Sequence, residues 1–562
     1  MPSSHMEHGP LKEAMITLAA MRSDRSSWDA EWRDLGDLVM PRSHRFNASE
    51  TNRGGKRSTK IVDGTATFSL RTLSAGMMSG VTSPARPWFE LTLPDKELAK
   101  HPPVKSWLWE VTKTLRSTLL GSNVYRALPS LYSQIGLYGT AAMTALEDDD
   151  KGVRFYNHPI GSFLLAQNDR LMVDTFAREF MMTARQLLKR FGPDNVSRNV
   201  HQLMESNNGE ERLPVIHMIR PNPDADPDKL HAKHKAFTSR YFEADRTDGG
   251  FLSEGGFDEF PTMAPRWDTT GEDIYGSDCP GMVALPDIQQ LQFQQKRKAK
   301  GIDKQIDPPM TGPTSMRNSR ATIRSGDITY IDTREGQQGF RAAHEVRFQL
   351  EGVLNDIYEL KQSVRRSYYE DLFLMMATDP RTQPPTAREV AERHEEKLLA
   401  LGPVLERLND ELLDPLIDRV FAIALRRGML PPPPPELEGA ELAVEYVSIM
   451  AQAQKLVGVS SVDRLLNVAG GIAQFSPDVV DKINSDRAID IYAEMLGTPP
   501  DLIRSEEEAA EIRQQRAEQQ QQQQQAEQAQ MNANTAETLS KTDMQNESAL
   551  KRLLAARGVP GA

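Results

Sequence analysis

The sequence predicts a mainly α-helical protein with an α+β body, built from several consecutive segments. Apolar residues recur at helical spacing in many stretches along the chain. The region 120–280 mixes alternating and helical patterns, which is typical of an α+β body. A helical pattern interrupted by prolines runs from Thr386 to Arg427 and would reach roughly 60 Å if straight, which exceeds the span of a small domain.

The N-terminal part is expected to contain three amphipathic helices and a strand. The first helix covers residues 10–40 and stops at Pro41. Asp63 can cap the second, and the third opens near Pro102, after a strand at 87–93. The apolar stripes of the three helices are Trp28, Trp32, Leu35 and Val39; Ala66, Leu70, Leu73 and Met77; and Val104, Leu108, Val111 and Leu115.

The body that follows is expected to be mixed. A helix is predicted at 125–146. Strands or short helices with loops between them are predicted at 152–165, 171–182, 213–220 and 237–243.

Two helices are expected next, at 286–305 and 345–376, separated by a stretch rich in Gly, Pro and Ser. The first helix carries a basic cluster that covers several helix faces, so at least one of its cations is expected to meet an interface or a polyanion; a solvated face is the alternative. A polar loop at 377–385 follows the second helix. The cluster is Lys296, Arg297, Lys298 and Lys300, and the loop contains Thr378, Asp379, Arg381, Thr382 and Gln383.

The long helical pattern is expected to be kinked at Pro403 and Pro415, because proline removes a backbone hydrogen bond and clashes with the preceding turn. Five prolines, 431–435, then form a stiff spacer before a strand near 442–448. Helical patterns continue over 451–496. The glutamine-rich tail after Ile503 is either a solvated helix or disordered, and its composition favours disorder in isolation and order only within an assembly.

Composition excludes several classes of protein. The formal net charge is −12, which argues against tight nucleic-acid binding but not against DNA that lies nearby and is repelled. The single cysteine, Cys279, cannot form a disulfide within the chain. No apolar run is long enough to span a membrane, and no signal peptide is expected. Residues 1–5 resemble a cloning remnant, with Met6 as the native start.

No catalytic, metal or cofactor site is expected, so the chain is predicted to be structural and not an enzyme. The stretch 54–58 lacks both the first glycine and the final Ser or Thr of a phosphate loop. His231 and His234 have no third ligand, and 148–150 is more consistent with a hairpin turn than with a magnesium site. His344 and Ser162 lack the sequence context of a zinc protease helix and of a nucleophile elbow.

Seven short segments together resemble the head-to-tail connector (portal) proteins of short-tailed, podovirus-like bacteriophages. Each is short, but their order and spacing make the set specific over about residues 11–496. Arg388 departs from the threonine that the family often has at that place. The segments are Trp28 to Trp32, Asp63 to Thr67, Ser79 to Phe89, Ala284 to Ile288, Asp307 to Pro309, Pro385 to Val390 and Leu401 to Val404.

The resemblance implies a portal fold and a ring of twelve subunits. The implied regions are a wing (1–285), two stem helices (286–305 and 345–376), a clip (306–344), a tunnel loop (377–385), a long kinked wing helix with a strand (386–449), a crown (450–503) and a tail or helical barrel (504–562). The tunnel-loop residues named above would face the DNA, and the basic cluster would form a ring on the stem. Pro403 and Pro415 would be the places to look for movement.

The resemblance also implies location and partners. The ring would sit at one capsid vertex of the virion, at the head–tail junction, after assembly in the host cytoplasm. It would pass double-stranded DNA without sequence specificity during packaging and ejection. It would dock the large terminase, the major capsid and scaffolding proteins, and tail adaptor or head-completion proteins. A scaffolding or tail-adaptor protein is the alternative, although the breaks at Gly402 and Pro415 disfavour a coiled coil.

Overall fold

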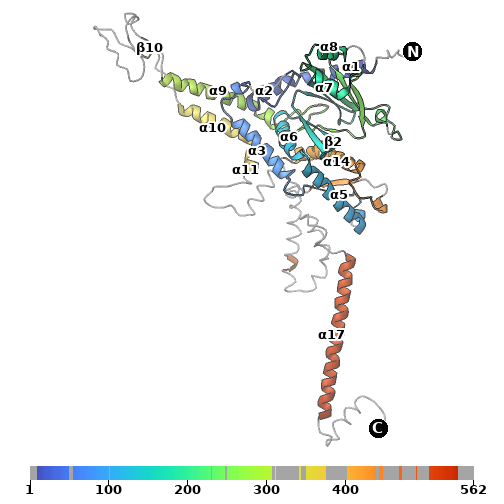
Figure 1. Ribbon diagram of the computed structural model, residues 1–562. Coiled ribbons are helices and arrows are strands. Elements are labelled where there is room, and N and C mark those ends of the chain that lie inside the picture. The colour runs from blue at the N-terminus through green and yellow to red at the C-terminus, as the bar shows by residue number, and fades with distance from the viewer. Residues whose placement is uncertain are drawn as a thin grey trace, which may run out of the picture. The chain divides into compact units, whose positions relative to one another are not determined.

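The computed structural model contains two compact units, residues 1–454 and 455–562 (Figure 1). The segments expected to form the tunnel loop (377–385), the clip (306–344) and the crown (450–503) lie wholly or almost wholly outside the described residues. The described residues are 9–49, 55–99, 101–229, 231–246, 250–306, 310–311, 341–342, 350–374, 401–437, 442–446, 468–470, 489 and 506–541.

The first predicted helix is two helices, α1 (Pro10–Ser26) and α2 (Asp29–Val39). The prediction of one helix over 10–40 is wrong at Ser27 and Trp28, because the two halves bury their apolar faces in different cores. α1 inserts Ala14, Leu18 and Met21 against the larger sheet, whereas α2 inserts Trp32, Leu35 and Val39 into the main core. The end before Pro41 is confirmed.

Helices α3 (Thr65–Gly80) and α5 (Pro102–Gly121) bury the apolar stripes predicted for them, and α6 (Val124–Tyr138) packs against α3. The helix predicted over 125–146 is wrong beyond Tyr138. Gly139 has a φ of 72°, a left-handed conformation that ends helices, and the chain continues as a strand. The minor helices here are η1 (Ser58–Lys60) and α4 (Lys96–Ala99).

Two antiparallel sheets form the β part of the body. The three-stranded sheet has the order β3-β2-β9, and the five-stranded sheet is a meander in the order β4-β5-β6-β7-β8. A separate pair joins β1 to β12 across most of the chain length. The bounds are β1 Phe89–Thr92, β2 Ala142–Asp148, β3 Gly152–His158, β4 Phe163–Gln167, β5 Val173–Thr183, β6 Arg212–Pro221, β7 Phe237–Glu243, β8 Ser253–Phe257, β9 Thr262–Met263 and β12 Ala443–Tyr446.

Two short helices, α7 (Ala184–Phe191) and α8 (Arg198–Glu205), cover one end of the meander. They form a small core of their own with the neighbouring strands. Thr183 caps α7 through a complete capping box with Gln186. The 3₁₀ turn η2 (Ala232–His234) precedes β7.

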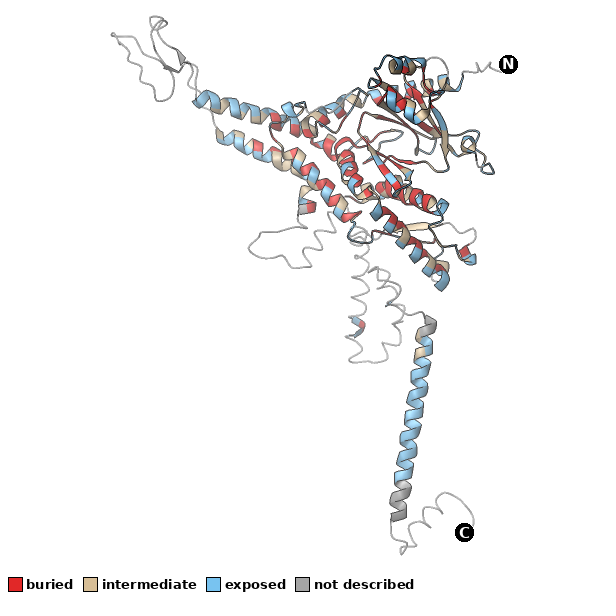
Figure 2. Ribbon diagram, viewed as in Figure 1, coloured by how far each residue is buried: buried red, intermediate tan, exposed pale blue. Residues whose placement is uncertain are grey.

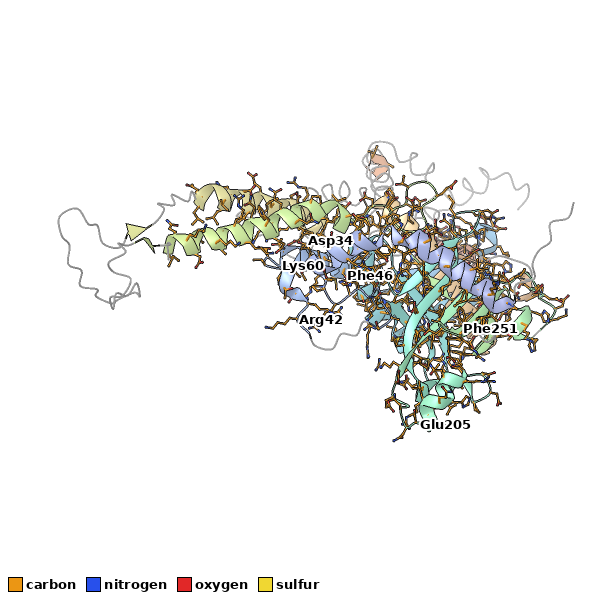
Figure 3. The ribbon with its side chains drawn as sticks, turned by 90° about the horizontal axis from the view of Figure 1, so that it is seen from above. Asp34, Arg42, Phe46, Lys60, Glu205 and Phe251 are labelled. Carbon is orange, nitrogen blue, oxygen red and sulfur yellow. The ribbon has the colours of Figure 1, made fainter. Side chains whose placement is uncertain are left out.

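Helices α9 (Pro280–Ile306) and α10 (Leu350–Ser367) lie side by side and extend beyond the body in both views (Figure 1, Figure 3). α9 begins six residues before the predicted start at 286, because Pro280 occupies the helix start and Pro286 is accommodated inside it. The second predicted helix is interrupted at Tyr368 and Tyr369, since Tyr369 has a φ of 54°, and resumes as α11 (Glu370–Leu374).

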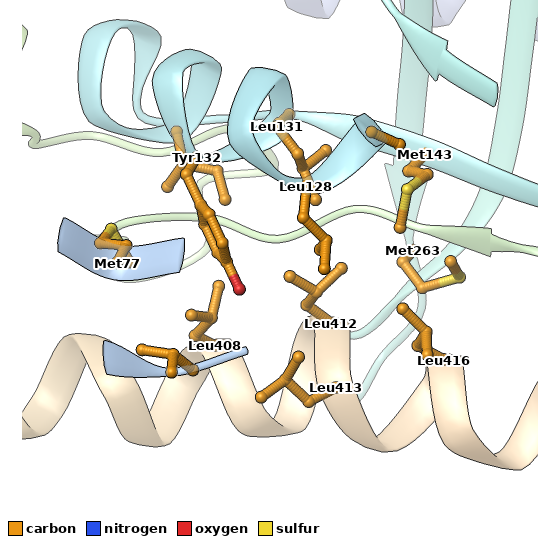
Figure 4. Packing of buried hydrophobic residues seen from close by; sticks show 14 of the residues in the cluster. Met77, Leu128, Leu131, Tyr132, Met143, Met263, Leu408, Leu412, Leu413 and Leu416 are labelled. Atoms are coloured by element: carbon orange, nitrogen blue, oxygen red, sulfur yellow. The ribbon is translucent and has the colours of Figure 1, made fainter. Parts of the chain in front are cut away.

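The described part of the long helical pattern is one helical path in three pieces: α13 (Gly402–Leu408), a π-helical turn (Asn409–Leu413) and α14 (Asp414–Arg426). Its leucines pack under α6 and beside β2 and β9 (Figure 4). The proline spacer ends in the short turn η5 (Pro435–Leu437). Of this first unit's described residues, none forms a helix able to cross a membrane, and the same holds for the second unit.

The second unit contains α17 (Glu506–Lys541), a helix of 36 residues. Of the two alternatives for the glutamine-rich tail, the structure has the solvated helix. Nearly every residue from 509 to 534 is exposed (Figure 2), as expected for a helix without an apolar stripe.

Candidate functional site

The paired helices α9 and α10 form the site that the sequence singled out. Their shared seam is apolar: Leu291 of α9 packs with Ile357 and Leu360 of α10, and partly buried Val353 completes the cluster. Ser363 Oγ donates a hydrogen bond of 2.5 Å to Asp287 Oδ2 at the end nearer the body. These contacts fix how the two helices are aligned along their length.

Asp63 joins this helix pair to α3. Its Oδ2 accepts a hydrogen bond of 2.8 Å from Gln295 Nε2 of α9 and lies 2.8 Å from Lys361 Nζ of α10. Its Oδ1 accepts from the backbone N–H of Thr65 at 2.9 Å, in the first turn of α3. Gly64, and not Asp63, is the N-cap residue, but the carboxylate still satisfies an amide at the helix start.

The side chain of Gln292, also on α9, binds the backbone at Val62 and Asp63. Its Oε1 accepts from the N–H groups of Val62 and Asp63 at 2.7 and 2.8 Å, while its Nε2 donates to the carbonyl of Asp63 at 2.8 Å. Gln292 is 4% exposed. We call Asp63, Gln292, Gln295 and Lys361 the stem clamp, because together they hold the root of the helix pair.

The charge of Asp63 is favoured by this setting. Burial raises the pKa of the carboxyl group, but the hydrogen bonds from Lys361 and Thr65 outweigh burial and leave the pKa below its usual value. A cavity of about 330 Å³ opens beside the clamp. It is lined by Asp63, Gly64, Thr65, Phe68, Ser69, Lys361, Arg365 and Glu370.

The basic cluster lies farther along α9, toward Ile306. Lys296, Arg297 and Lys300 are exposed and Lys298 is half-buried. Arg297 stacks over Phe293, with its guanidinium carbon 5.3 Å from the ring centroid. Among the described residues, none of the four cations forms an ion pair.

Two short strands lie beyond the tips of these helices. β10 (Met310–Thr311) pairs antiparallel with β11 (Arg341–Ala342), so the segment between α9 and α10 returns on itself. The predicted DNA-facing residues of the tunnel loop lie outside the described residues, as do the remainder of the clip and residues 386–400.

The two prolines of the long pattern occupy different settings. Pro403 is exposed in the first turn of α13, where a missing N–H costs little. Pro415 lies in the first turn of α14, directly after the π-helical turn, whose extra width accommodates the proline ring. Leu412, Leu413 and Leu416 beside it are all fully buried.

An ion pair at the π-helical turn was missed by the sequence reasoning. Glu411 accepts from the backbone N–H of Arg266 at 2.8 Å and from its Nη2 at 2.6 Å. Arg266 is 5% exposed, so the pair fastens the long helical path to the body beside β9. Pro415 predicted only a kink nearby, and no local pattern links residues 145 positions apart.

Two of the stretches that were rejected as metal sites on sequence form local turn contacts. Asp148 caps the β2–β3 turn by accepting from the N–H groups of Asp150 and Lys151, which confirms the hairpin interpretation. His231 Nδ1 accepts from the N–H of Lys233 within its own turn. Across the described part of the chain, no group of three His, Cys, Asp or Glu side chains could hold a metal ion.

Comparison with known proteins identifies relatives over nearly the whole chain. The family model described as "Bacteriophage head to tail connecting protein" matches residues 11–503. The "Portal protein" of Salmonella phage epsilon15 is 46% identical over 551 residues, covering 98% of this chain and 99% of that protein. The "Probable portal protein" of Bordetella phage BPP-1 is 43% identical over 530 residues, covering 94% and 95%.

Two solved structures align at a lower level. A chain of the "Virion of native gene transfer agent (GTA) particle" is 12% identical with a TM-score of 0.36, covering 81% of this chain and 97% of that one. A chain of the "Neck of empty GTA particle computed with C6 symmetry" is 11% identical with a TM-score of 0.34, covering 77% and 90%. Likeness at this level carries no argument about this chain.

Proposed function

The chain belongs to the family of bacteriophage head to tail connecting proteins, and we propose that twelve copies form a ring whose channel passes double-stranded DNA during packaging and ejection. It is a structural portal subunit of the virion, and its place is the capsid vertex. The resemblance that the sequence motifs indicated is thus confirmed at the level of the family.

The observation that supports the conduit most directly is the α9–α10 pair. α9 has 27 residues and therefore spans about 40 Å. The pair is held by the stem clamp near the body, and its outer faces are exposed over most of its length (Figure 2). Repeated around an axis, such pairs would line a passage with parallel walls.

We propose the regional assignment that the family resemblance implies. The body up to residue 285 is the wing, α9 and α10 are the stem helices, and 306–344 is the clip. The tunnel loop is 377–385, and the long helical path with β12 belongs to the wing. Residues 450–503 form the crown, and α17 belongs to the tail or barrel.

Charge suits a passage through which DNA must slide. Twelve copies at −12 each carry −144, and repulsion keeps the duplex from adhering to the wall. Arg381 supplies one cation per subunit in the tunnel loop, beside Thr378, Asp379, Thr382 and Gln383. The basic cluster Lys296, Arg297, Lys298 and Lys300 is available to phosphate or to a docked protein.

The ring would also be a docking platform. The large terminase would supply the energy for packaging, since the chain offers no phosphate loop. The capsid, scaffolding and tail-adaptor proteins would bind its outer regions. Of the two prolines, Pro403 is better placed for movement, because Pro415 lies among fully buried leucines.

Deletion of residues 378–383 tests the conduit apart from the ring. Rings should still assemble, since this loop follows the stem helices and contains no apolar residue apart from proline. Packaging or retention of DNA should be impaired. Rings that package and retain DNA as well as the intact protein would refute the role of the loop, and failed assembly would make it part of the structural core.

A further inference from the structure

The outer face of α9 carries an exposed stripe that mixes one aromatic side chain with cations. Phe293, Arg297, Lys300 and Lys304 follow one another at spacings of four, three and four residues, so they lie on one face of the helix. Phe293 is 57% exposed, and the three cations are exposed as well. We call these four residues the α9 stripe.

The outer face of α10 carries a stripe of the complementary kind. Glu351, Leu354 and Tyr358 are spaced by three and four residues. Leu354 is 44% and Tyr358 63% exposed, and Glu351 is exposed. These three residues are the α10 stripe, which offers a carboxylate and an aromatic ring where the α9 stripe offers cations and an aromatic ring.

The two stripes cannot meet within one chain. The apolar seam between α9 and α10 is centred on Leu291, Ile357 and Leu360, and the stripes lie on the faces turned away from that seam. Packed helices already stand about 8–10 Å apart at their axes. Any partner of either outer face (pale blue in Figure 2) must therefore come from outside the pair.

The two stripes lie at matching heights, where height is the position along the shared axis of the helix pair. Counting from the Asp287–Ser363 hydrogen bond, Phe293 is six residues along α9 and Tyr358 is five residues back along α10. Lys300 is thirteen residues along, and Glu351 is twelve residues back. With a rise of about 1.5 Å per residue, the members of each pair differ in height by only about 1.5 Å.

We infer that the α9 stripe of one subunit binds the α10 stripe of the next copy of the same chain. Rotation about a ring axis parallel to the pair keeps heights unchanged, so it brings Phe293 to the partner subunit's Tyr358 and Lys300 to the partner subunit's Glu351. This contact is heterologous, which is the kind that closes into rings. The inference rests on the proposed ring and assigns the exposed basic cluster to the neighbouring subunit in preference to DNA.

Opposite charges at matching heights favour a second copy of the chain, over a polyanion, as the partner of the two stripes. Arg297 and Lys300 face outward without a carboxylate of their own among the described residues, and Glu351 faces outward without a cation. A polyanion would satisfy the cations but would leave Phe293, Leu354 and Tyr358 in water. A second copy covers both the charges and the apolar groups.

Paired cysteines test the contact directly. The single native thiol, Cys279, is 1% exposed, so introduced cysteines report without background. Phe293→Cys with Tyr358→Cys in the full chain should, on mild oxidation, give a ladder on a non-reducing gel that extends past the dimer. A symmetric contact would stop at the dimer, and cross-linking within one chain is excluded because the two sites face apart.

A mismatched pair is the control. Phe293→Cys with Arg366→Cys places the second thiol on exposed α10 surface about 12 Å farther along the helix, and it should give no ladder. Charge provides a second test. Lys300→Glu should raise the concentration needed for assembly about tenfold or more, and Glu351→Lys added to it should restore assembly.

The outcomes separate this inference from the proposed ring. Rings seen by electron microscopy together with a ladder and charge rescue support it. Rings without a ladder, or Lys300→Glu rings that form normally and then lose DNA, overturn it in favour of a channel-facing role and leave the ring intact. Absence of rings from the unaltered protein would refute the proposed function itself.

Discussion

Replacing Asp63 by alanine should loosen the root of the α9–α10 pair. The substitution removes the bond to the Thr65 amide, worth about 1 kcal/mol, and the charge-assisted bond from Gln295, worth about 1.5 kcal/mol. The Lys361 ion pair adds less than about 1 kcal/mol, since the lysine side chain is 31% exposed. The expected loss is about 3 kcal/mol.

Hydrogen exchange measured by mass spectrometry on peptides covering residues 62–70 and 288–296 resolves this loss locally. A change of about 3 kcal/mol corresponds to exchange faster by about a hundredfold. Asp63→Asn retains an acceptor for Thr65 and should show a smaller effect. Asp303→Ala, an exposed acid on the same helix α9, should show none.

The same variant predicts a dependence on pH. Because the folded pKa of Asp63 lies below its usual value of 3.8, the carboxylate stabilises the native chain above that pH and loses this contribution as the pH falls further. The difference between wild type and Asp63→Ala should therefore be full at pH 7 and shrink below pH 3.8. A less than threefold change in exchange at pH 7 would refute the clamp.

Three other substitutions test the packing. Glu411→Ala leaves the buried charge of Arg266 without its carboxylate and should destabilise the body by about 3 kcal/mol. The melting temperature should fall, and an unchanged melting temperature would contradict the importance of this ion pair. Gly281→Ala places a Cβ 2.2 Å from the carbonyl oxygen of Leu137 and should abolish soluble expression, which wild-type yield would disprove. The Cβ that Gly352→Ala adds on α10 meets no atom within 4 Å. This substitution should stabilise the chain by roughly 0.5–1 kcal/mol in the same melting assay, and a lower melting temperature would contradict the prediction.

Amphipathic patterns predicted the helices correctly where the apolar face of a helix packs into a single hydrophobic core. The stripes of α3 and α5 are buried as expected, and β7 has the predicted bounds, because local periodicity alone decides burial there. The helix 10–40 was wrong at Ser27 because its two halves face different cores, which periodicity cannot show. The end of α6 depends on Gly139, whose left-handed conformation leads the chain into β2.

The candidate site was predicted only in outline. The basic residues and the two helices α9 and α10 were recognisable from composition and pattern. Their anchor was not, because Asp63 meets Gln292 and Gln295 more than 220 positions away. Glu411 and Arg266 are likewise brought together by the tertiary fold alone. The matching positions of the two stripes follow from the alignment of α9 with α10, which tertiary contacts such as Asp287–Ser363 fix.

Electron cryomicroscopy of the purified chain tests the central claim most directly. The account predicts closed rings, twelvefold in symmetry, with α9 and α10 of every subunit surrounding a channel wide enough for duplex DNA and with the α9 stripe against the next α10 stripe. Particles that stay monomeric at high concentration, or rings whose α9–α10 pairs point away from the axis, would contradict it.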